Sequence, residues 1–285
     1  MSRNNSDRTG ATIQAEAPII DTEQEQKLNP MHFVAPTEFV DLPSKGIGYD
    51  ASHPMHGKDT LEIRFMTAKD EDILTSKTLL KKGVAIERFL DNIIVDKNVK
   101  ASSLLVGDRN AIVIAARISG YGADYTTNVT CPSCFANTEH TFDLNKKQVH
   151  ESTTDEKIGL EQTPDGLFKI NMPLSKFEVH FKLLKGNDEI HLAKVATNKS
   201  KGKTIETTLT DQYKRMVVSV QGHTEQSVIN EFINNLPTRD SRFLRTCYRM
   251  ANPDVKVVDN FSCTACGFEQ ELEVPFGADF FWPDR

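Results

Sequence analysis

Features that would assign a class of protein directly are missing from this chain of 285 residues. No apolar run approaches the ~18 residues that a membrane-spanning helix needs. The first ten residues are polar and no apolar stretch follows them, so a secretory signal is not predicted. A Gly-rich phosphate loop, a nucleophile elbow, a His-Glu-x-x-His motif and a paired-carboxylate motif are all missing, so an enzyme is not predicted. The net charge of −6 disfavours a generally basic nucleic-acid binder.

The hydrophobic share of the chain is also low, at 38%, which indicates that part of the chain is not packed. Residues 1–30 are rich in Ser, Asn, Thr, Gln and Glu, and they are predicted to be a disordered leader. A short docking peptide centred on Ile19 and Ile20 is the alternative. Lys199, Lys201 and Lys203 are expected in a solvated loop, with contact to an acidic partner as the other reading.

Residues 31–144 combine strand and helix patterns. Extended segments are predicted at 39–43 and 61–65, the second from its alternation of apolar and polar residues. A helical stretch begins at the acidic residues 70–72 and stops at Gly83, and a second helix has one apolar stripe over 86–94. A third helix is predicted from Asp108, as its N-cap, to the residue before Gly120. Strands at 125–130 and 135–144 then form a hairpin around a Cys-Pro-Ser-Cys turn.

Residues 167–275 repeat this order of elements. Asp108, Arg117 and Cys131 recur as Asp240, Arg249 and Cys263, each at the same spacing. We therefore predict an α+β fold with internal duplication of a strand–helices–Cys-hairpin unit. The predicted organisation is a leader (1–30), a first repeat (31–144), a polar linker with a Pro-Asp-Gly turn (145–166), a second repeat (167–275) and an aromatic tail (276–285).

The five cysteines carry the clearest chemistry. Four of them form two Cys-x-x-Cys pairs between strand-like segments: Cys131, Cys134, Cys263 and Cys266. Two such knuckles make a closed four-thiolate site, so we predict one structural zinc ion held by all four, with the two hairpins forming a zinc-ribbon-like site. The alternatives are a thiol–disulfide redox motif, an iron–sulfur cluster and a vestigial site that holds no metal. Cys247 lies in a predicted helix and is expected to be a small buried hydrophobe.

The remaining candidates are histidines and aromatic residues. His53 and His56 are expected to be loop residues, and His140 and His150 flank the first hairpin as spare ligands that four thiolates make unnecessary. The C-terminus gathers Phe276, Phe280, Phe281 and Trp282. This tail either folds back over the zinc hairpins or docks on another subunit as an interface.

Several segments of the chain resemble those of a known family. The segment from Phe39 to Tyr49, the strand-into-helix over 61–72 and the Cys-Pro-Ser-Cys hairpin are similar to T-even-type myophage baseplate hub proteins, including the hub assembly factors. The resemblance covers roughly residues 35–275. It implies a protein of a contractile phage tail that helps to build the baseplate hub through contacts with other hub proteins, and it implies no catalytic residues. The corresponding location is the host cytoplasm during assembly, or the tail baseplate of the virion.

The sequence therefore leaves three functional hypotheses. The first is a structural or assembly protein of the baseplate hub, stabilised by zinc. The second is a zinc-ribbon nucleic-acid-binding module, which the acidic residues of the Cys hairpins oppose. The third is an enzyme or redox protein.

Overall fold

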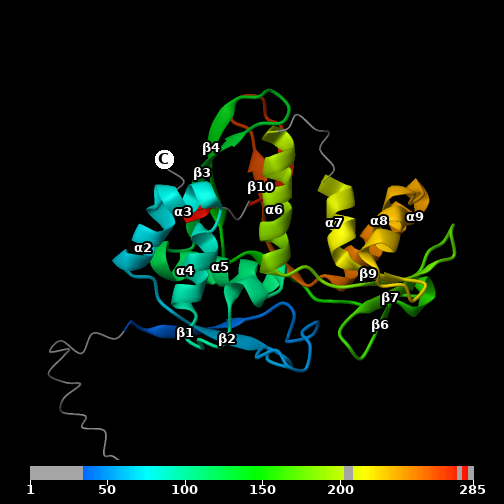
Figure 1. Ribbon diagram of the computed structural model, residues 1–285. Helices are drawn as coiled ribbons and strands as arrows, with labels where there is room; N and C mark the ends of the chain where they lie inside the picture. The colour runs from blue at the N-terminus through cyan, green and yellow to red at the C-terminus, as the bar shows by residue number, and fades with distance from the viewer. Residues whose placement is uncertain (1–34, 202–207, 275–277, 282–285) are drawn as a thin grey trace, which may run out of the picture. The chain divides into compact units, whose positions relative to one another are not determined.

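The computed structural model describes residues 35–201, 208–274 and 278–281 (Figure 1). Pro36–Arg285 forms one compact unit, distinct from Met1–Ala35. The predicted leader with Ile19 and Ile20 lies outside the described residues, and so do the side chains of Lys199, Lys201 and Lys203. Elements of the first half are β1 (Thr37–Asp41), β2 (Thr60–Arg64), α2 (Ala68–Thr75), α3 (Lys77–Lys82), α4 (Ala85–Ile93), the 3-10 turn η1 (Ala101–Ser103), α5 (Val106–Tyr121), β3 (Asp124–Thr130) and β4 (Asn137–Asp143).

The second half has a similar sequence of strands, helices and a final hairpin. A short join comes first, with β5 (Lys147–His150), η2 (Glu156–Ile158) and β6 (Glu161–Gln162). It is followed by β7 (Phe168–Asn171), β8 (Glu178–Phe181), α6 (Gly186–Lys201), α7 (Thr208–Met216), β9 (Val217–Val220), α8 (Gln226–Asn234), α9 (Thr238–Ala251), β10 (Asp254–Ser262), β11 (Glu269–Glu273) and η3 (Ala278–Phe281). The chain is thus a mixed α/β protein.

Within the described ranges, the strands form four small sheets. They are the pairs β1–β2 and β3–β4, the three strands β11-β10-β5 and the four strands β6-β7-β8-β9. The first part of β10, Asp254–Val257, pairs with β5, and its last part, Val258–Ser262, pairs with β11. The predicted linker 145–166 therefore contains strands that pair with both neighbouring sheets.

One hydrophobic core joins the two halves. Its buried residues run from Val40 near the start of the described chain to Phe281 near its end. The apolar stripe predicted for α4 lies in this core, with Phe89, Leu90 and Ile93 fully buried. Cys247 on α9 is also fully buried, as predicted.

The prediction for Asp108 was wrong. Helix α5 begins at Val106 with Leu105 as its N-cap, and Asp108 lies in the first turn, completely buried. Its carboxylate accepts hydrogen bonds from the amide and hydroxyl of Ser44, at 3.0 and 2.6 Å, and from the Tyr49 hydroxyl at 2.6 Å. Sequence pattern alone identified a polar residue at the helix start, but the loop that it binds is 64 residues away in the chain.

The aromatic C-terminus folds back onto the chain. Phe280 lies against Tyr125 with ring centroids 4.9 Å apart, and Phe281 lies against Phe89 at 5.2 Å. Each of the two phenylalanines is 1% exposed. Of the two alternatives that the sequence left open, Phe280 and Phe281 therefore follow the folding back and do not form an exposed interface, while Phe276 and Trp282 lie outside the described residues.

The part of the chain that the structure describes contains no helix with the length and apolar content that crossing a membrane requires.

Candidate metal centre

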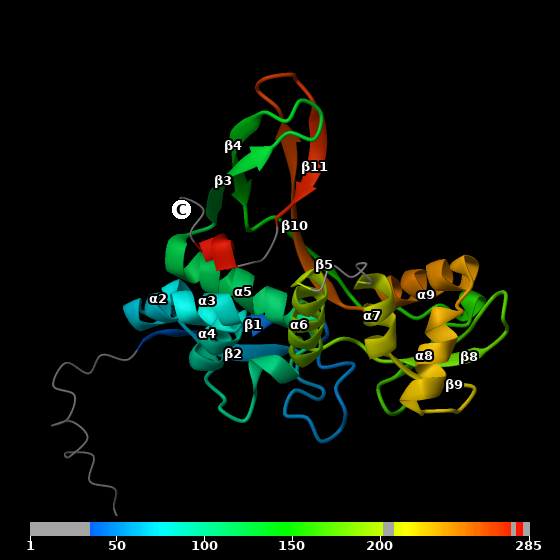
Figure 2. The same cartoon turned by 45° about the horizontal axis from the view of Figure 1, so that its top comes forward.

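The two Cys hairpins extend side by side away from the helices (Figure 2). We call them the arm, which comprises residues 124–143 and 254–273. The hairpin strands are long and regular: β3 pairs with β4 over seven residues each, and β10 pairs with β11 over five. Each Cys-x-x-Cys pair lies at the turn of its hairpin, so both turns meet at the tip of the arm.

The two turns have the same local geometry. In the first, the Phe135 amide donates to the Cys131 carbonyl at 2.9 Å, and in the second the Gly267 amide donates to the Cys263 carbonyl at 2.9 Å. Both donors have left-handed backbone, with φ of 61° at Phe135 and 70° at Gly267. Glycine adopts this conformation without cost, whereas phenylalanine does not. Phe135 is also 78% exposed. Phe135 was not among the residues predicted from the sequence, although an aromatic residue where the other knuckle has glycine was a visible signal.

The four predicted cysteine sulfurs converge at one point. All four Sγ atoms lie within 4.8 Å of one another. Cys131 Sγ is 3.8 Å from Cys266 Sγ, and Cys134 Sγ is 3.7 Å from Cys263 Sγ, so the close pairs join the two hairpins and are not disulfides. A tetrahedron with metal–sulfur bonds of about 2.3 Å has sulfur–sulfur edges of about 3.8 Å. The arrangement could therefore hold a metal ion.

The electrostatics of the cluster favour a cation. Burial by itself would raise the pKa of the Cys131 thiol, but hydrogen bonds from the amides of Cys134 and Ser133, and then from the Cys263 and Cys134 side chains, lower that pKa to about 7. The Phe268 amide lowers the pKa of Cys266, but the neighbouring sulfurs outweigh it and raise that pKa to about 12. Four adjacent thiolates repel one another, and a bound cation removes that repulsion.

The arm has little hydrophobic core of its own. Its separate cluster of buried residues consists of Cys131, Phe261 and Cys263. Val129, Phe268 and Leu272 pack against it, only partly buried. Because this cluster is small, the burial of apolar surface stabilises the arm only a little. A metal ion would therefore be the main link between the two hairpin tips.

The arm is anchored to the helices at its root. Helix α5 packs against β10 where Gly107 meets Pro253 and Asp254. A Cβ atom at Gly107 would lie 2.1 Å from the Pro253 carbonyl oxygen, so only glycine permits this approach.

The other sequence candidates lie away from the sulfurs. His53 Nε2 is 2.9 Å from the Ser103 hydroxyl, and His56 Nδ1 is 2.9 Å from the Tyr49 carbonyl oxygen. His150 Nε2 is 2.8 Å from the Arg249 carbonyl oxygen. The ring of His140 packs edge-on against Phe142 and Phe261. Burial raises the pKa of the Cys247 thiol to about 11, as expected of an unreactive residue.

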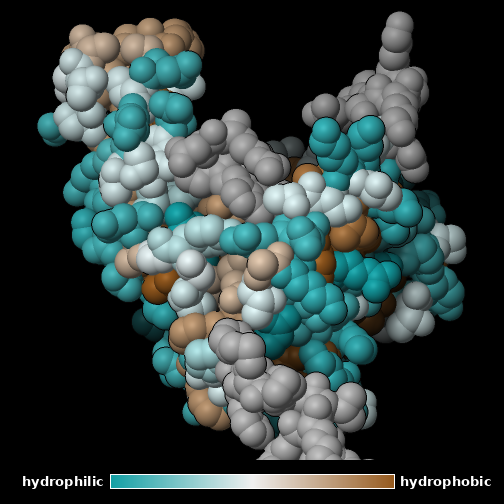
Figure 3. Space-filling model, turned by 90° about the vertical axis from the view of Figure 1, so that its left-hand side faces the viewer, coloured by the Kyte–Doolittle hydropathy of each residue, from teal (hydrophilic) through white to brown (hydrophobic). Residues whose placement is uncertain are grey.

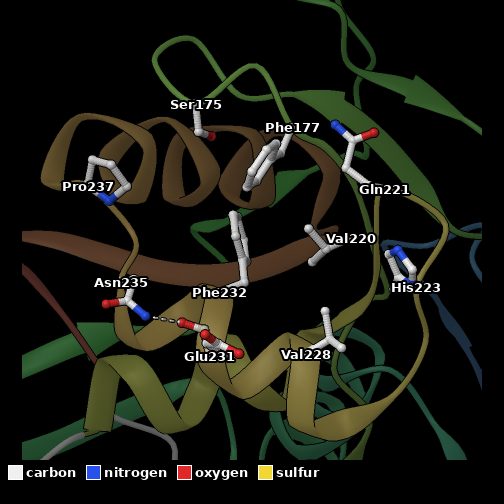
Figure 4. A pocket seen from close by; sticks show the side chains of 10 residues that line it. All are labelled: Ser175, Phe177, Val220, Gln221, His223, Val228, Glu231, Phe232, Asn235 and Pro237. Atoms are coloured by element: carbon white, nitrogen blue, oxygen red, sulfur yellow. Dashed lines mark hydrogen bonds between the residues drawn. The ribbon is translucent and has the colours of Figure 1, made fainter.

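A cavity of about 540 Å³ lies between the β8–β9 sheet and α8 (Figure 4). Phe177 and Phe232 pack against each other in its wall, with ring centroids 5.8 Å apart, and Val220 and Val228 extend this apolar wall. His223 and Gln221 lie at one side. Such a largely apolar lining suits the binding of apolar side chains of a partner better than the catalysis of a reaction between polar groups.

A comparison with protein families shows which family this chain belongs to. The family model of the T4 bacteriophage base plate protein matches residues 37–282. The chain belongs to this family. The family predicted from the sequence is thereby confirmed for a T4-type baseplate protein, without assignment to a particular hub subunit. Neither the curated proteins nor the solved structures contain a match to this chain.

Proposed function

We propose that this baseplate protein is a non-enzymatic structural or assembly component of the baseplate hub, held together by one structural zinc ion. The observation that carries the proposal is the convergence of four cysteine sulfurs from two hairpins. The two close pairs join cysteines that are 135 residues apart (Cys131 and Cys266) and 129 residues apart (Cys134 and Cys263) in the chain. An ion at this point would join distant segments of one fold, which is a structural role. Family membership supplies the setting, because baseplates are built through contacts among their proteins.

The donor set fits zinc in particular. Four thiolates from two knuckles form the closed type of zinc site, which leaves no coordination position for water or substrate. Cys131, Cys134, Cys263 and Cys266 would hold the ion. The backbone amides that point at the Cys131 sulfur keep this ligand close to its thiolate form. Zinc would then stabilise the arm and take no part in a reaction.

An internal duplication accounts for the shared site. Contacts at the starts of α2 and α6 match: the Asp70 carboxylate accepts from the Thr67 amide at 2.8 Å, and the Asp188 carboxylate accepts from the Lys185 amide at 3.0 Å. Each carboxylate also pairs with a basic side chain that ends the preceding strand region, Arg64 at 2.6 Å and Lys182 at 3.0 Å respectively.

A second match lies at α5 and α9. Asp108 binds the amide of Ser44, just after Pro43, and Asp240 binds the amides of Leu174 and Ser175, just after Pro173. These equivalences support repeats at 31–144 and 167–275 with the segment 145–166 between them. Each repeat would then contribute half of the metal site.

The alternative of nucleic-acid binding has no support at the arm. Residues 124–143 carry three acidic and no basic side chains, and residues 254–273 carry five acidic and one basic. Glu269, Glu271 and Glu273 are all exposed on β11. Such a surface repels phosphate. Contacts with other baseplate hub proteins, made in the host cytoplasm during assembly and retained or lost in the virion, fit the family better.

The hub role is tested by isolating hub complexes and finished tails from cells infected with the phage that encodes this chain. Mass spectrometry should detect the chain in hub assembly intermediates, in tails or in both. Phage in which the gene carries an early stop codon should accumulate tails or hubs arrested in assembly, and the plasmid-borne gene should restore them. Absence from every assembly fraction would contradict the proposal.

A further inference from the structure

The tip of the arm presents one large apolar side chain, Phe135, that the fold does not use. Figure 3 shows the tip as the brown patch at the end of the projection at the upper left. Phe135 is the largest exposed apolar side chain of the two knuckles, at 78% exposure, and Ala265 and the cysteines Cys134 and Cys266 are exposed there as well. Neither burial nor backbone preference explains a phenylalanine with φ of 61° at this position. Strained, exposed aromatic residues are typical of contact sites.

The arm is also strongly acidic. Its eight acidic and one basic side chains give −7, whereas the whole chain has −6. The remaining residues are therefore close to neutral, at +1. A partner for the arm needs cations around an apolar socket, because a like-charged surface would repel it.

The same chain has such a socket. A cavity of about 450 Å³ lies between the end of α9 and the root of β10. Tyr248 and Met250 give it apolar surface, and the rest of its lining is polar or charged: His150, Thr246, Arg249, Asn252, Asp254 and Lys256. This volume exceeds that of a phenyl ring.

Helix α9 adds positive charge next to the cavity. Arg242, Arg245 and Arg249 are exposed and lie within about 60° of one another around the helix. They form no ion pair with another described residue. Lys256, at the rim, is 2.9 Å from Glu273 and so is already paired. The basic stripe of α9 is thus free to face an acidic surface.

The arm cannot reach the socket of its own chain. The cavity includes Asp254, at the root of β10, whereas Phe135 lies at the far end, beside the cysteine cluster. The nine residues of β10 span about 30 Å. A tip that enters this socket must therefore come from a second molecule.

We propose that two copies of this chain dock head to tail, with Phe135 of one copy in the α9–β10 cavity of the next. The acidic strands of the arm then face Arg242 and Arg245. The contact is heterologous, so repetition builds a ring or an open filament. Because the tip is small, association is expected to be weak, on the order of 10 µM, and sensitive to salt. The proposal rests on the metal-closed arm of the proposed function, but not on the hub role.

Sedimentation velocity on the full-length, zinc-loaded chain tests this contact. The wild type should associate more as its concentration rises, and less in high salt. Phe135→Ala should weaken association at least about tenfold, equivalent to about 1.4 kcal/mol. Phe135→Gly should weaken it equally while relieving the left-handed strain, which separates lost contact from lost folding. Phe39→Ala, at a phenylalanine that is 69% exposed on β1, is the matched control and should change nothing.

A charge exchange tests the partner. Glu269→Lys with Glu271→Lys reverses the arm, and Arg242→Glu with Arg245→Glu reverses the socket. Each double variant alone should be monomeric, and a mixture of the two should associate in alternation. A metal-loaded wild type that stays monomeric at every concentration would overturn the docking proposal and leave the zinc site standing. Association that survives Phe135→Gly, or a mixture that stays monomeric, would overturn it as well.

Discussion

Replacing Gly107 by alanine tests a close approach between helix α5 and the root of the arm. The added Cβ would lie 2.1 Å from the Pro253 carbonyl oxygen and 2.8 Å from the Asp254 Cα, both backbone atoms. Ordinary contacts of this kind begin near 3.4 Å, so α5 and β10 would have to separate by about 1 Å. Overpacking of a tight site costs about 1–3 kcal/mol, and clashes with rigid backbone lie at the upper end. The better helix propensity of alanine returns about 1 kcal/mol. We expect a net loss of about 2 kcal/mol.

Gly120→Ala on the same helix is the matched control. Its Cβ would meet the flexible side chain of Met66, with the sulfur 3.0 Å away. Methionine adjusts readily, so the propensity gain should dominate and the free energy of unfolding should stay equal or rise by up to about 1 kcal/mol. Guanidinium titrations followed by far-ultraviolet circular dichroism measure both variants. If Gly107→Ala is as stable as Gly120→Ala, the root of the arm is not packed on α5 as described.

Three further predictions concern single side chains. Hydrogen bonds from Arg64 and Thr67 outweigh the burial of Asp70 and lower its pKa to about 2, so this carboxylate contributes stability above pH ~4 that is lost as the pH falls towards ~2. Arg64→Gln should therefore cost up to about 2 kcal/mol at pH 7 and progressively less towards pH 2 in urea titrations, and an equal loss at both pH values would contradict this pairing. Asp240→Ala leaves the Leu174 and Ser175 amides without their acceptor and should lower the free energy of unfolding by about 2 kcal/mol, whereas an unchanged value would mean that water replaces the carboxylate. Cys247 should resist alkylation by iodoacetamide in the folded chain, because burial raises its pKa to about 11; rapid labelling at this position would show that α9 opens.

Local patterns in the sequence predicted much of the secondary structure because the relevant forces act over a few residues. The apolar stripe of α4 and the glycine that ends α3 are local signals of this kind, and both lie where expected. The start of α5 was misplaced because Asp108 is held by Ser44 and Tyr49 in a distant loop. A distant contact also explains why the strands in residues 145–166 were not predicted: β5 pairs with β10, which lies more than a hundred residues later in the chain.

The candidate site was predicted in its residues but not in its surroundings. Cys-x-x-Cys spacing is a local property, and the equal spacing in the two halves brought four cysteines into one hypothesis. Nothing local showed that Phe280 and Phe281 would be buried against Tyr125 and Phe89 in place of facing a partner. The exposure of Phe135 is likewise a tertiary property, since a hydrophobic residue at a hairpin turn is as often covered as free.

The central claim is that one ion joins the two halves through four thiolates, and metal content measures it most directly. Inductively coupled plasma mass spectrometry on the purified chain should give one zinc per molecule. Cys131→Ser and Cys263→Ser, one from each hairpin, should each lose the ion, with the loss of up to roughly 10–16 kcal/mol of binding free energy. Cys247→Ser should keep it. Full zinc content in either hairpin variant, or two ions per chain, would contradict the shared site.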